Sequence, residues 1–238
     1  MERELSVVIP TYNEKNNLQV LIPRILTVFK NNKIDGEIIV VDDRSNDGSF
    51  EYLNEQTKLI PELKVIFRNP PPSLSRAWYD GFVASSKKNI VSMDADLCYD
   101  PEVIPVMLEK MNNYDVVVGS RYVRSRFTLM KGKPVFLVYL SIIGQFIART
   151  VTGLAVYDTS SGFRMFKKEV FSAIKDKLKT KGNTFLIEFL FFAKNNGAKI
   201  LEIPIVYGER VYGTTKLKIL REGFRYLGFL ARVLLRNY

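Results

Sequence analysis

Residues 90–97 read IVSMDADL, a short run of strand-forming residues that ends in the acidic pair Asp94 and Asp96. Side chains alternate along an extended chain, so the two carboxylates point the same way. Two acids on one side repel each other unless a cation lies between them, and their oxygens suit a divalent cation that also binds a diphosphate. The alternative is a pair of ordinary loop acids, because so short a motif recurs by chance.

Similar strand-like runs lie on both sides of this one, and helix-length amphipathic segments fill the gaps between them. The predicted strands cover residues 5–9, 37–41, 63–67, 90–93, 115–118 and 199–206. This alternation predicts an α/β fold, with a mostly parallel sheet flanked by helices. Ligands of such sheets bind beyond the carboxyl ends of the strands. The polar residues 10–14 (PTYNE) and 42–48 (DDRSNDG) follow two of these strands, so we expect them to share a site with the acidic pair.

The composition limits the chemistry of this site. The chain has no histidine and one cysteine, Cys98. This excludes a histidine general base, a Ser–His triad and the usual zinc sites. The net charge of +10 indicates anionic partners, which include nucleic acid, a phosphorylated substrate and an acidic membrane surface. No nucleic-acid-binding motif is present, so we expect no nucleic acid partner.

The length and the ends of the chain predict its organisation. Its 238 residues, 47% of them hydrophobic, suffice for one large domain, which we place at residues 1–208. Residues 209–238 are expected to form a basic loop and a basic amphipathic helix. The amino terminus lacks the apolar stretch of a signal peptide, so we do not expect secretion.

Six segments together resemble family 2 glycosyltransferases of the GT-A (Rossmann-like) fold, and within them the polyprenyl-phosphate sugar transferases typified by dolichol-phosphate mannose synthase. The segments are residues 8–14 (VIPTYNE), 40–48 (VVDDRSNDG), 93–97 (MDADL), 119–122 (GSRY), 158–164 (DTSSGFR) and 210–216 (RVYGTTK). The first three are typical of the broad family, and the last three narrow the resemblance. It extends over nearly the whole chain.

The resemblance implies roles for particular residues. A nucleoside pocket, a diphosphate and Mg²⁺ or Mn²⁺ site, phosphate-binding cations and an acceptor-phosphate site are expected. The residues implied are Pro10, Tyr12, Glu14, Val41 and Asp43 for the nucleoside; Asp94, Ala95 and Asp96 for the diphosphate, with Asp94 and Asp96 on the metal; Arg210 and Lys216 for phosphates; and Arg121 and Ser141 for the acceptor. Asp94, Asp96 and Arg121 would be the catalytic residues.

Arg210 and Lys216 also suggest a lid on grounds that do not depend on the resemblance. They flank Gly213 in a segment with turn character, and such a loop can close two cations onto a leaving diphosphate. The alternative is a solvated basic loop, because exposed basic residues are common. Arg121 follows a predicted strand and could likewise be an ordinary surface arginine.

The resemblance implies transfer of a sugar, with inversion, from a nucleoside diphosphate to a polyprenyl or dolichyl phosphate. GDP-mannose is the favoured donor, and UDP-glucose is the alternative. The acceptor phosphate is already anionic near neutral pH, so a chain without histidine needs no strong base. Another alternative is a noncatalytic nucleotide-sugar-binding subunit of a membrane assembly. It is motivated by Cys98 and Leu137 at positions where the family has polar side chains; Arg44, Ser73 and Ser75 also depart from the family, which has glycines there.

Two segments suggest contact with a membrane. Residues 134–148 carry no charge but are too few to span a bilayer, and the basic segment 121–133 precedes them. In the tail, apolar side chains at helical spacing lie beside basic ones, at Leu220, Phe224, Leu227, Ala231 and Leu234. We therefore expect peripheral association with the cytoplasmic face of a membrane, with or without a membrane subunit. The alternative is that this apolar stripe packs on the domain.

Overall fold

The computed structural model describes residues 3–69, 71–122, 135–208, 210, 212 and 219–236, without the side chains of 135–138 and 219–220. Within these residues the chain alternates between strands and helices. The strands are β1 (Glu4–Thr11), β2 (Asp35–Asp42), β3 (Leu63–Phe67), β4 (Asn89–Ser92), β5 (Val116–Ser120), β6 (Arg164–Lys167) and β7 (Ile200–Pro204). The helices are α1 (Lys15–Asn32), α2 (Ser49–Leu59), α3 (Leu74–Ala84), α4 (Ile104–Lys110), α5 (Val135–Thr152), α6 (Lys168–Ile174), α7 (Thr184–Asn195) and α8 (Ile219–Leu234), with the 3₁₀ turns η1 (Pro101–Val103) and η3 (Lys175–Lys177).

The strands form one sheet in the order β3-β2-β1-β4-β6-β5-β7. All pairs are parallel except those made by β6, which runs antiparallel to β4 and β5. The predicted mostly parallel sheet is therefore confirmed, and each of the six predicted strands is present: residues 63–67 coincide with β3, and the other five have shifted ends. The sequence prediction omitted β6, whose four residues RMFK carry a charge at each end and closely follow the polar segment 158–162.

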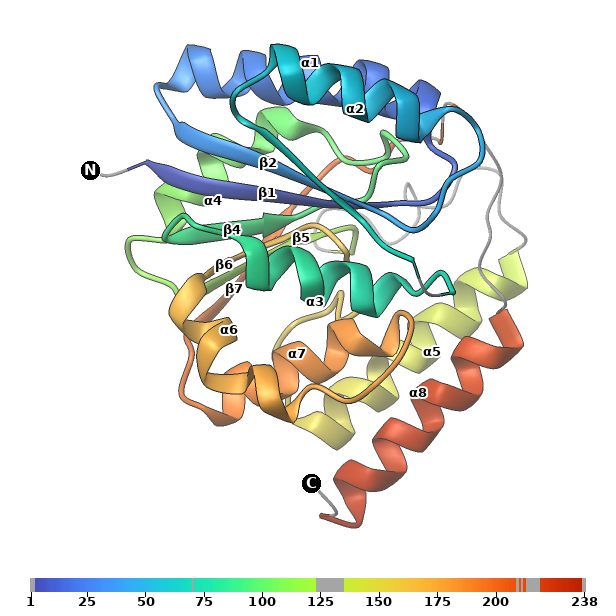
Figure 1. The fold of residues 1–238 in the computed structure, drawn as a ribbon. Helices are drawn as coiled ribbons and strands as arrows, with labels where there is room; N and C mark the ends of the chain where they lie inside the picture. The colour runs from blue at the N-terminus through green and yellow to red at the C-terminus, as the bar shows by residue number, and fades with distance from the viewer. Residues whose placement is uncertain are drawn as a thin grey trace.

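Helices cover both faces of the sheet (Figure 1). The apolar sides of α1 and α4 pack on one face, with Leu18, Leu21 and Met107 in the core. On the other face, α3, α6 and α7 contribute an aromatic core around Phe82, where the rings of Phe166 and Phe189 lie 4.9 and 6.4 Å from its ring. Because helices cover both faces, we expect ligands to bind at the ends of the strands. These two sides of the sheet are called here the amino edge and the carboxyl edge.

The last helix, α8, packs beside α5 and α7 at the border of the second face (Figure 1). Its buried side chains include Phe229 and Leu230, whereas Phe224, Leu227 and Leu234 are exposed. Most of the described side chains in the apolar stripe expected from the sequence are therefore exposed. The helix packs on the domain through another side, which carries Phe229 and Leu230. Helical spacing alone could not decide this, because α8 has apolar residues on more than one side.

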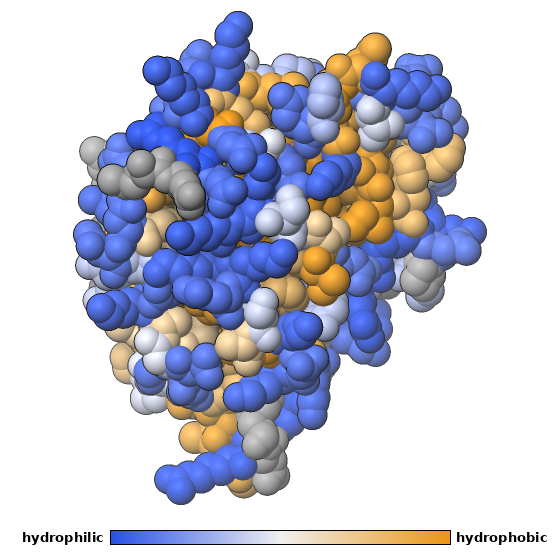
Figure 2. All heavy atoms as spheres, turned by 60° about the vertical axis from the view of Figure 1, so that its left-hand side comes forward, coloured by the Kyte–Doolittle hydropathy of each residue, from blue (hydrophilic) through white to orange (hydrophobic). Residues whose placement is uncertain are grey.

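The amino-terminal edge of the sheet is the side from which β1 starts. Figure 2 brings this side forward and shows hydrophilic side chains over most of it, with smaller hydrophobic areas between them. The described parts of the motifs that the sequence singled out lie at the opposite edge, where β1, β2 and β4 end.

Candidate active site

The loops after β1 and β2 are joined to each other at the carboxyl edge. The backbone N–H of Asn13 donates to Ser45 Oγ at 2.7 Å, and the N–H of Asn46 donates to Asn13 Oδ1 at 2.8 Å. Asp42 in turn accepts from the N–H and the hydroxyl of Ser45. These bonds hold the two predicted nucleoside-binding loops together as one wall.

Asp43 is fixed at the base of this wall. Its carboxylate is 5% exposed, forms an ion pair with Arg68 and accepts the N–H of Ser73 at 2.7 Å. Burial raises the pKa of Asp43 even though Arg68 and Ser73 oppose the shift. A carboxylate oriented in this way can accept hydrogen bonds from a base or a ribose.

The other predicted nucleoside residues lie at the same edge but differ in exposure. Tyr12 is 38% exposed and Glu14 is half-buried, so both side chains can reach a ligand. Pro10 is buried, and the side chain of Val41 lies fully in the core. Any contact that Val41 makes with a nucleoside therefore has to come from its backbone.

Asp94 and Asp96 follow β4 at the centre of the edge. Asp96 is nearly buried, and its Oδ1 accepts the N–H of Cys98 at 3.1 Å. Burial, and next the charge of Asp96, raise the pKa of Asp94 to about 7. Ala95 between them is buried. The raised pKa reflects two acidic groups that are held close together in a poorly solvated place.

The backbone is strained around this edge. Asn13, Arg44 and Leu97 have positive φ angles of 55°, 58° and 63°, which is uncommon for residues other than glycine. Each lies in a loop that follows β1, β2 or β4. The angle at Arg44 gives a physical reason for the glycine that the family has there, since glycine adopts this conformation without steric cost.

Arg210 lies over the acidic pair. Its Nη2 is 2.9 Å from Asp96 Oδ2, and its Nη1 is 3.9 Å from Glu14 Oε1. The segment that carries it is fixed by the N–H of Gly208, which donates to the carbonyl of Cys98 at 2.8 Å. Arg210 is thus positioned next to the acids, while Lys216, the other predicted phosphate-binding residue, lies outside the described residues.

Arg121, just after β5, belongs to a buried ion pair. Its Nε and Nη2 donate to the two oxygens of Asp158 at 2.7 and 2.8 Å, and Nη2 also donates to Ser160. Next to it, the hydroxyls of Tyr122 and Ser141 are hydrogen-bonded at 2.8 Å. The structure therefore brings the two predicted acceptor residues into one neighbourhood.

Comparison with known proteins gives the family. Residues 6–175 match glycosyl transferase family 2. The chain belongs to this family. It is 35% identical over 236 residues to the dolichol-phosphate mannosyltransferase of Pyrococcus furiosus, covering 97% of this chain and 64% of that relative's length. It is 30% identical over 214 residues to the undecaprenyl-phosphate mannosyltransferase of Micrococcus luteus, covering 88% and 86% of the two chains.

The fold of this family 2 glycosyltransferase is of the GT-A type. It is similar to glucosyl-3-phosphoglycerate synthase from Mycobacterium tuberculosis, with a TM-score of 0.69 at 19% identity over 98% of this chain and 80% of that one. That enzyme has also been solved with Mn²⁺ and UDP. The predicted fold class and the predicted family are both confirmed.

The site residues of this glycosyltransferase fit a divalent cation. Asp94 and Asp96 supply hard oxygen donors, and phosphate oxygens and water usually complete the shell of Mg²⁺ or Mn²⁺. In the described parts of the chain, no third acidic or cysteine side chain completes a metal-binding group with them. Burial, followed by the charge of Asp96, raises the pKa of Cys98 to about 12, so its side chain is a thiol at neutral pH.

Sequence reasoning missed three residues that position this site. Arg68 holds Asp43, Asp158 holds Arg121, and Glu202 accepts the N–H groups of Tyr157 and Asp158 at 2.8 and 2.7 Å. Asp158 begins the segment DTSSGFR, which the sequence offered as a family motif without a role. No sequence signal indicated Arg68 or Glu202, since each contacts its partner only across the folded sheet.

Proposed function

We propose that this protein transfers a sugar, with inversion, from a nucleoside diphosphate to a polyprenyl or dolichyl phosphate, with GDP-mannose as the favoured donor. The observation that carries the proposal is the arrangement at the carboxyl edge, where Arg210 lies on the acidic pair and Arg121 lies beside Ser141. One group of charges suits a departing diphosphate, and the other suits an incoming phosphate. The names of the two relatives, both polyprenyl-phosphate mannosyltransferases, support the choice of acceptor and sugar.

On the donor side, Asp43, Tyr12 and Glu14 would bind the nucleoside, together with the backbone of Pro10 and Val41. Asp94 and Asp96 would hold Mg²⁺ or Mn²⁺ around Ala95, and the cation would neutralise charge on the diphosphate. Arg210, joined by Lys216, would bind the phosphates from the lid side. Binding of the donor would replace the contact of Arg210 with Asp96 by contacts to phosphate, since both anions compete for the same guanidinium.

On the acceptor side, Arg121 would orient the lipid phosphate. Its bonds to Asp158 and Ser160 use Nε and Nη2, and Nη1 takes part in none of them. Ser141 would add a hydroxyl donor. A phosphate with a second pKa near 6 is already a nucleophilic anion at neutral pH, so positioning two reactants supplies most of the rate. Attack from the face opposite to the leaving diphosphate inverts the anomeric carbon.

A lipid acceptor requires contact with a membrane surface. In the described residues no helix is both long and apolar enough to cross a membrane. The neighbouring helices α5 and α8 expose large hydrophobic side chains, among them Ile143, Phe146, Phe224 and Leu227. We propose that residues 1–208 form the catalytic domain and that residues 209–238 add the lid and a membrane contact. Association would be peripheral, on the cytoplasmic face, alone or through a membrane subunit.

The test is to incubate the purified protein with polyprenyl phosphate, Mn²⁺ or Mg²⁺, and either GDP-mannose or UDP-glucose, and to measure the glycolipid formed. We expect product from GDP-mannose, and a rate at least about 100-fold lower for Asp96→Ala because charge stabilisation at the diphosphate is lost. Asp100→Ala, which removes an exposed acid nearby, is the matched control and should retain the wild-type rate. Product from UDP-glucose alone would change the donor, whereas donor binding without product would indicate the noncatalytic subunit. An Asp96→Ala enzyme as fast as wild type would refute the mechanism.

A further inference from the structure

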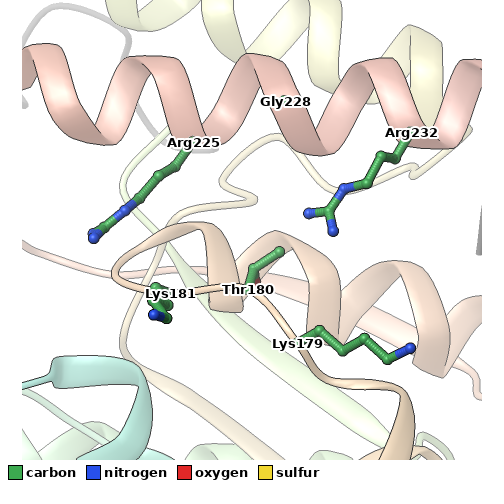
Figure 3. A pocket seen from close by; sticks show the side chains of 6 residues that line it. All are labelled: Lys179, Thr180, Lys181, Arg225, Gly228 and Arg232. Carbon is green, nitrogen blue, oxygen red and sulfur yellow. The ribbon is translucent and has the colours of Figure 1, made fainter.

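A basic cavity lies apart from the candidate active site, between α8 and the loop that precedes α7. Its volume is about 330 Å³, and it is lined by Lys179, Thr180, Lys181, Arg225, Gly228 and Arg232. None of these residues belongs to the carboxyl edge of the sheet. Arg225 and Arg232 both extend from α8 toward the loop that carries the two lysines (Figure 3).

The charge of this cavity favours an anion. Lys179 and Lys181 are exposed, and among the described residues neither ammonium group has an acidic or hydrogen-bonding partner. Arg225 is paired with Glu222 at 2.5 Å. Among the described residues, Glu188 is the other carboxylate beside the cavity, and its charge interacts with that of Arg232. The two lysines of the loop therefore add positive charge beyond these pairings. An anion that enters the cavity meets an excess of positive charge from two separate elements.

Glu188 and Glu222 also hold the walls of the cavity in place through hydrogen bonds to the loop. Glu188 on α7 is fully buried, and its Oε2 accepts the N–H groups of Lys179 and Thr180 and the hydroxyl of Thr180 at 3.0, 2.9 and 2.7 Å. Glu222 on α8 accepts the N–H of Asn183 at 2.8 Å. The loop is thereby held to both helices, and the cations stand on a fixed frame, which reduces the entropy lost on binding.

Gly228 leaves room between the two arginines. It lies three residues after Arg225 and four before Arg232, so all three share one side of α8. A Cβ added at Gly228 would meet no atom within 4 Å. The space in front of it is therefore open to a ligand rather than filled by a neighbouring side chain.

We propose that this cavity is a second anion site, which binds a phosphate group through Lys179, Lys181, Arg225 and Arg232. Guanidinium and ammonium groups together are the usual partners of phosphate in proteins. The phosphate can belong to the headgroup of an acidic lipid, next to the exposed apolar residues of α8, or to a soluble phosphorylated molecule. The site is independent of the proposed sugar transfer, because its residues take no part in donor or acceptor binding.

Two probes distinguish the sources of the phosphate. The soluble arm titrates isotope-labelled protein with inorganic phosphate and follows backbone amide signals by NMR. We expect saturable shifts at Thr180, Lys181 and Gly228 that are separate from any shifts at the carboxyl edge. The lipid arm measures co-sedimentation with phosphatidylcholine vesicles that contain 20% phosphatidic acid, and with vesicles of phosphatidylcholine alone.

Two variants test the assignment, each with a matched control. Lys179→Gln/Lys181→Gln should weaken binding to the responding probe at least about tenfold, since each basic residue near an anionic surface contributes about 1 kcal/mol. Lys175→Gln/Lys177→Gln removes the same charge from the adjacent turn and should have a much smaller effect. In the soluble arm, Gly228→Glu should abolish the shifts by placing a carboxylate between the arginines. Gly223→Glu, on the same helix but outside the cavity, should preserve them.

The two arms distinguish a soluble ligand, a lipid headgroup and a failure of the proposal. Shifts in the soluble arm that the cavity variants remove would support the site and identify a soluble ligand, and loss of vesicle binding in the same variants would identify a lipid headgroup. If the cavity and control variants behave alike in both arms, binding reflects only the overall positive charge and the proposal is wrong. The absence of binding to either probe would also overturn it.

Discussion

Two acids at opposite edges of the sheet, Glu37 and Asp94, have opposite environments. At the amino edge, Glu37 is 3% exposed, and its oxygens accept from Ser6 Oγ, the N–H of Ser86 and Lys64 Nζ, each at 2.6 Å. At the carboxyl edge, no hydrogen bond from the described residues reaches Asp94, and the neighbouring acid Asp96 repels it. Glu37 is fully paired, whereas Asp94 has no such partner among the described residues, and the cation proposed for this site would supply one. We therefore expect Glu37 to stabilise the fold and Asp94 to destabilise it in the absence of the proposed ligand.

The largest expected change in stability is at Asp158, a buried acid of the carboxyl edge that, like Asp43 and unlike Asp94, is held in an ion pair. Asp158→Asn removes the charge that Arg121 faces, and their side chains are 0% and 20% exposed. We expect a loss of about 3 kcal/mol in the free energy of unfolding, because a buried arginine is left without its counter-ion. Urea denaturation at pH 7 measures this loss.

The control for this change is Asp80→Asn, which removes a 39%-exposed acid from Arg68. It should cost less than about 1 kcal/mol, since exposed ion pairs contribute little. Equal losses in the two variants would show that burial of the pair at Arg121 has no energetic consequence.

At Glu37 we expect a smaller loss in the free energy of unfolding, and this loss depends on pH. Burial alone would raise its pKa, but the bonds from Lys64, Ser6 and Ser86 outweigh burial and lower the pKa to about 2. Because the folded pKa lies below the unfolded one, the ionised acid stabilises the fold above about pH 4.3, and this stabilisation is lost as the pH falls toward 2. Glu37→Gln should therefore cost about 2 kcal/mol at pH 7 and almost nothing near pH 2.

Denaturation curves across this pH range provide the measurement. Asp35→Asn serves as the control, since Asp35 is 65% exposed in its pair with Lys87. It should change the unfolding free energy by less than about 0.5 kcal/mol. A loss at Glu37→Gln that stays constant from pH 7 to pH 2 would contradict the proposed role of the ionised carboxylate.

The sequence predicted the strands and the polar strand ends because both are local. Runs such as residues 38–41 are β-branched, and Asp94 and Asp96 follow a strand closely. It could not predict the partners of the site, because Arg121 and Asp158 are 37 residues apart and meet only in the folded chain. The orientation of α8 was missed for a similar reason. Phe229 and Leu230 are buried because α5 and α7 cover that side, and this is a property of the tertiary structure.

The smallest expected change in the free energy of unfolding is at Asp94, where the substitution should stabilise the protein and not destabilise it. Burial and the neighbouring Asp96 raise its pKa to about 7, so ionising Asp94 disfavours the folded state. This cost is absent below about pH 4, where the acid is protonated in both states, and is complete above about pH 7. Without metal or nucleotide, Asp94→Asn should therefore stabilise the protein by about 1 kcal/mol at pH 8, because the two acids share the repulsion and part of it is screened.

The same variant should lose sugar transfer, since an amide is a weaker cation ligand than a carboxylate. The measurement is urea denaturation in EDTA at pH 8 and pH 4, with the transfer assay run in parallel. A gain in stability at pH 8 that disappears at pH 4, together with lost activity, would mean that charge repulsion at the carboxyl edge is retained for ligand binding at the expense of stability. An Asp94→Asn protein less stable than wild type at pH 8 would instead mean that Asp94 stabilises the fold as Glu37 does, and the contrast between the two edges would no longer hold.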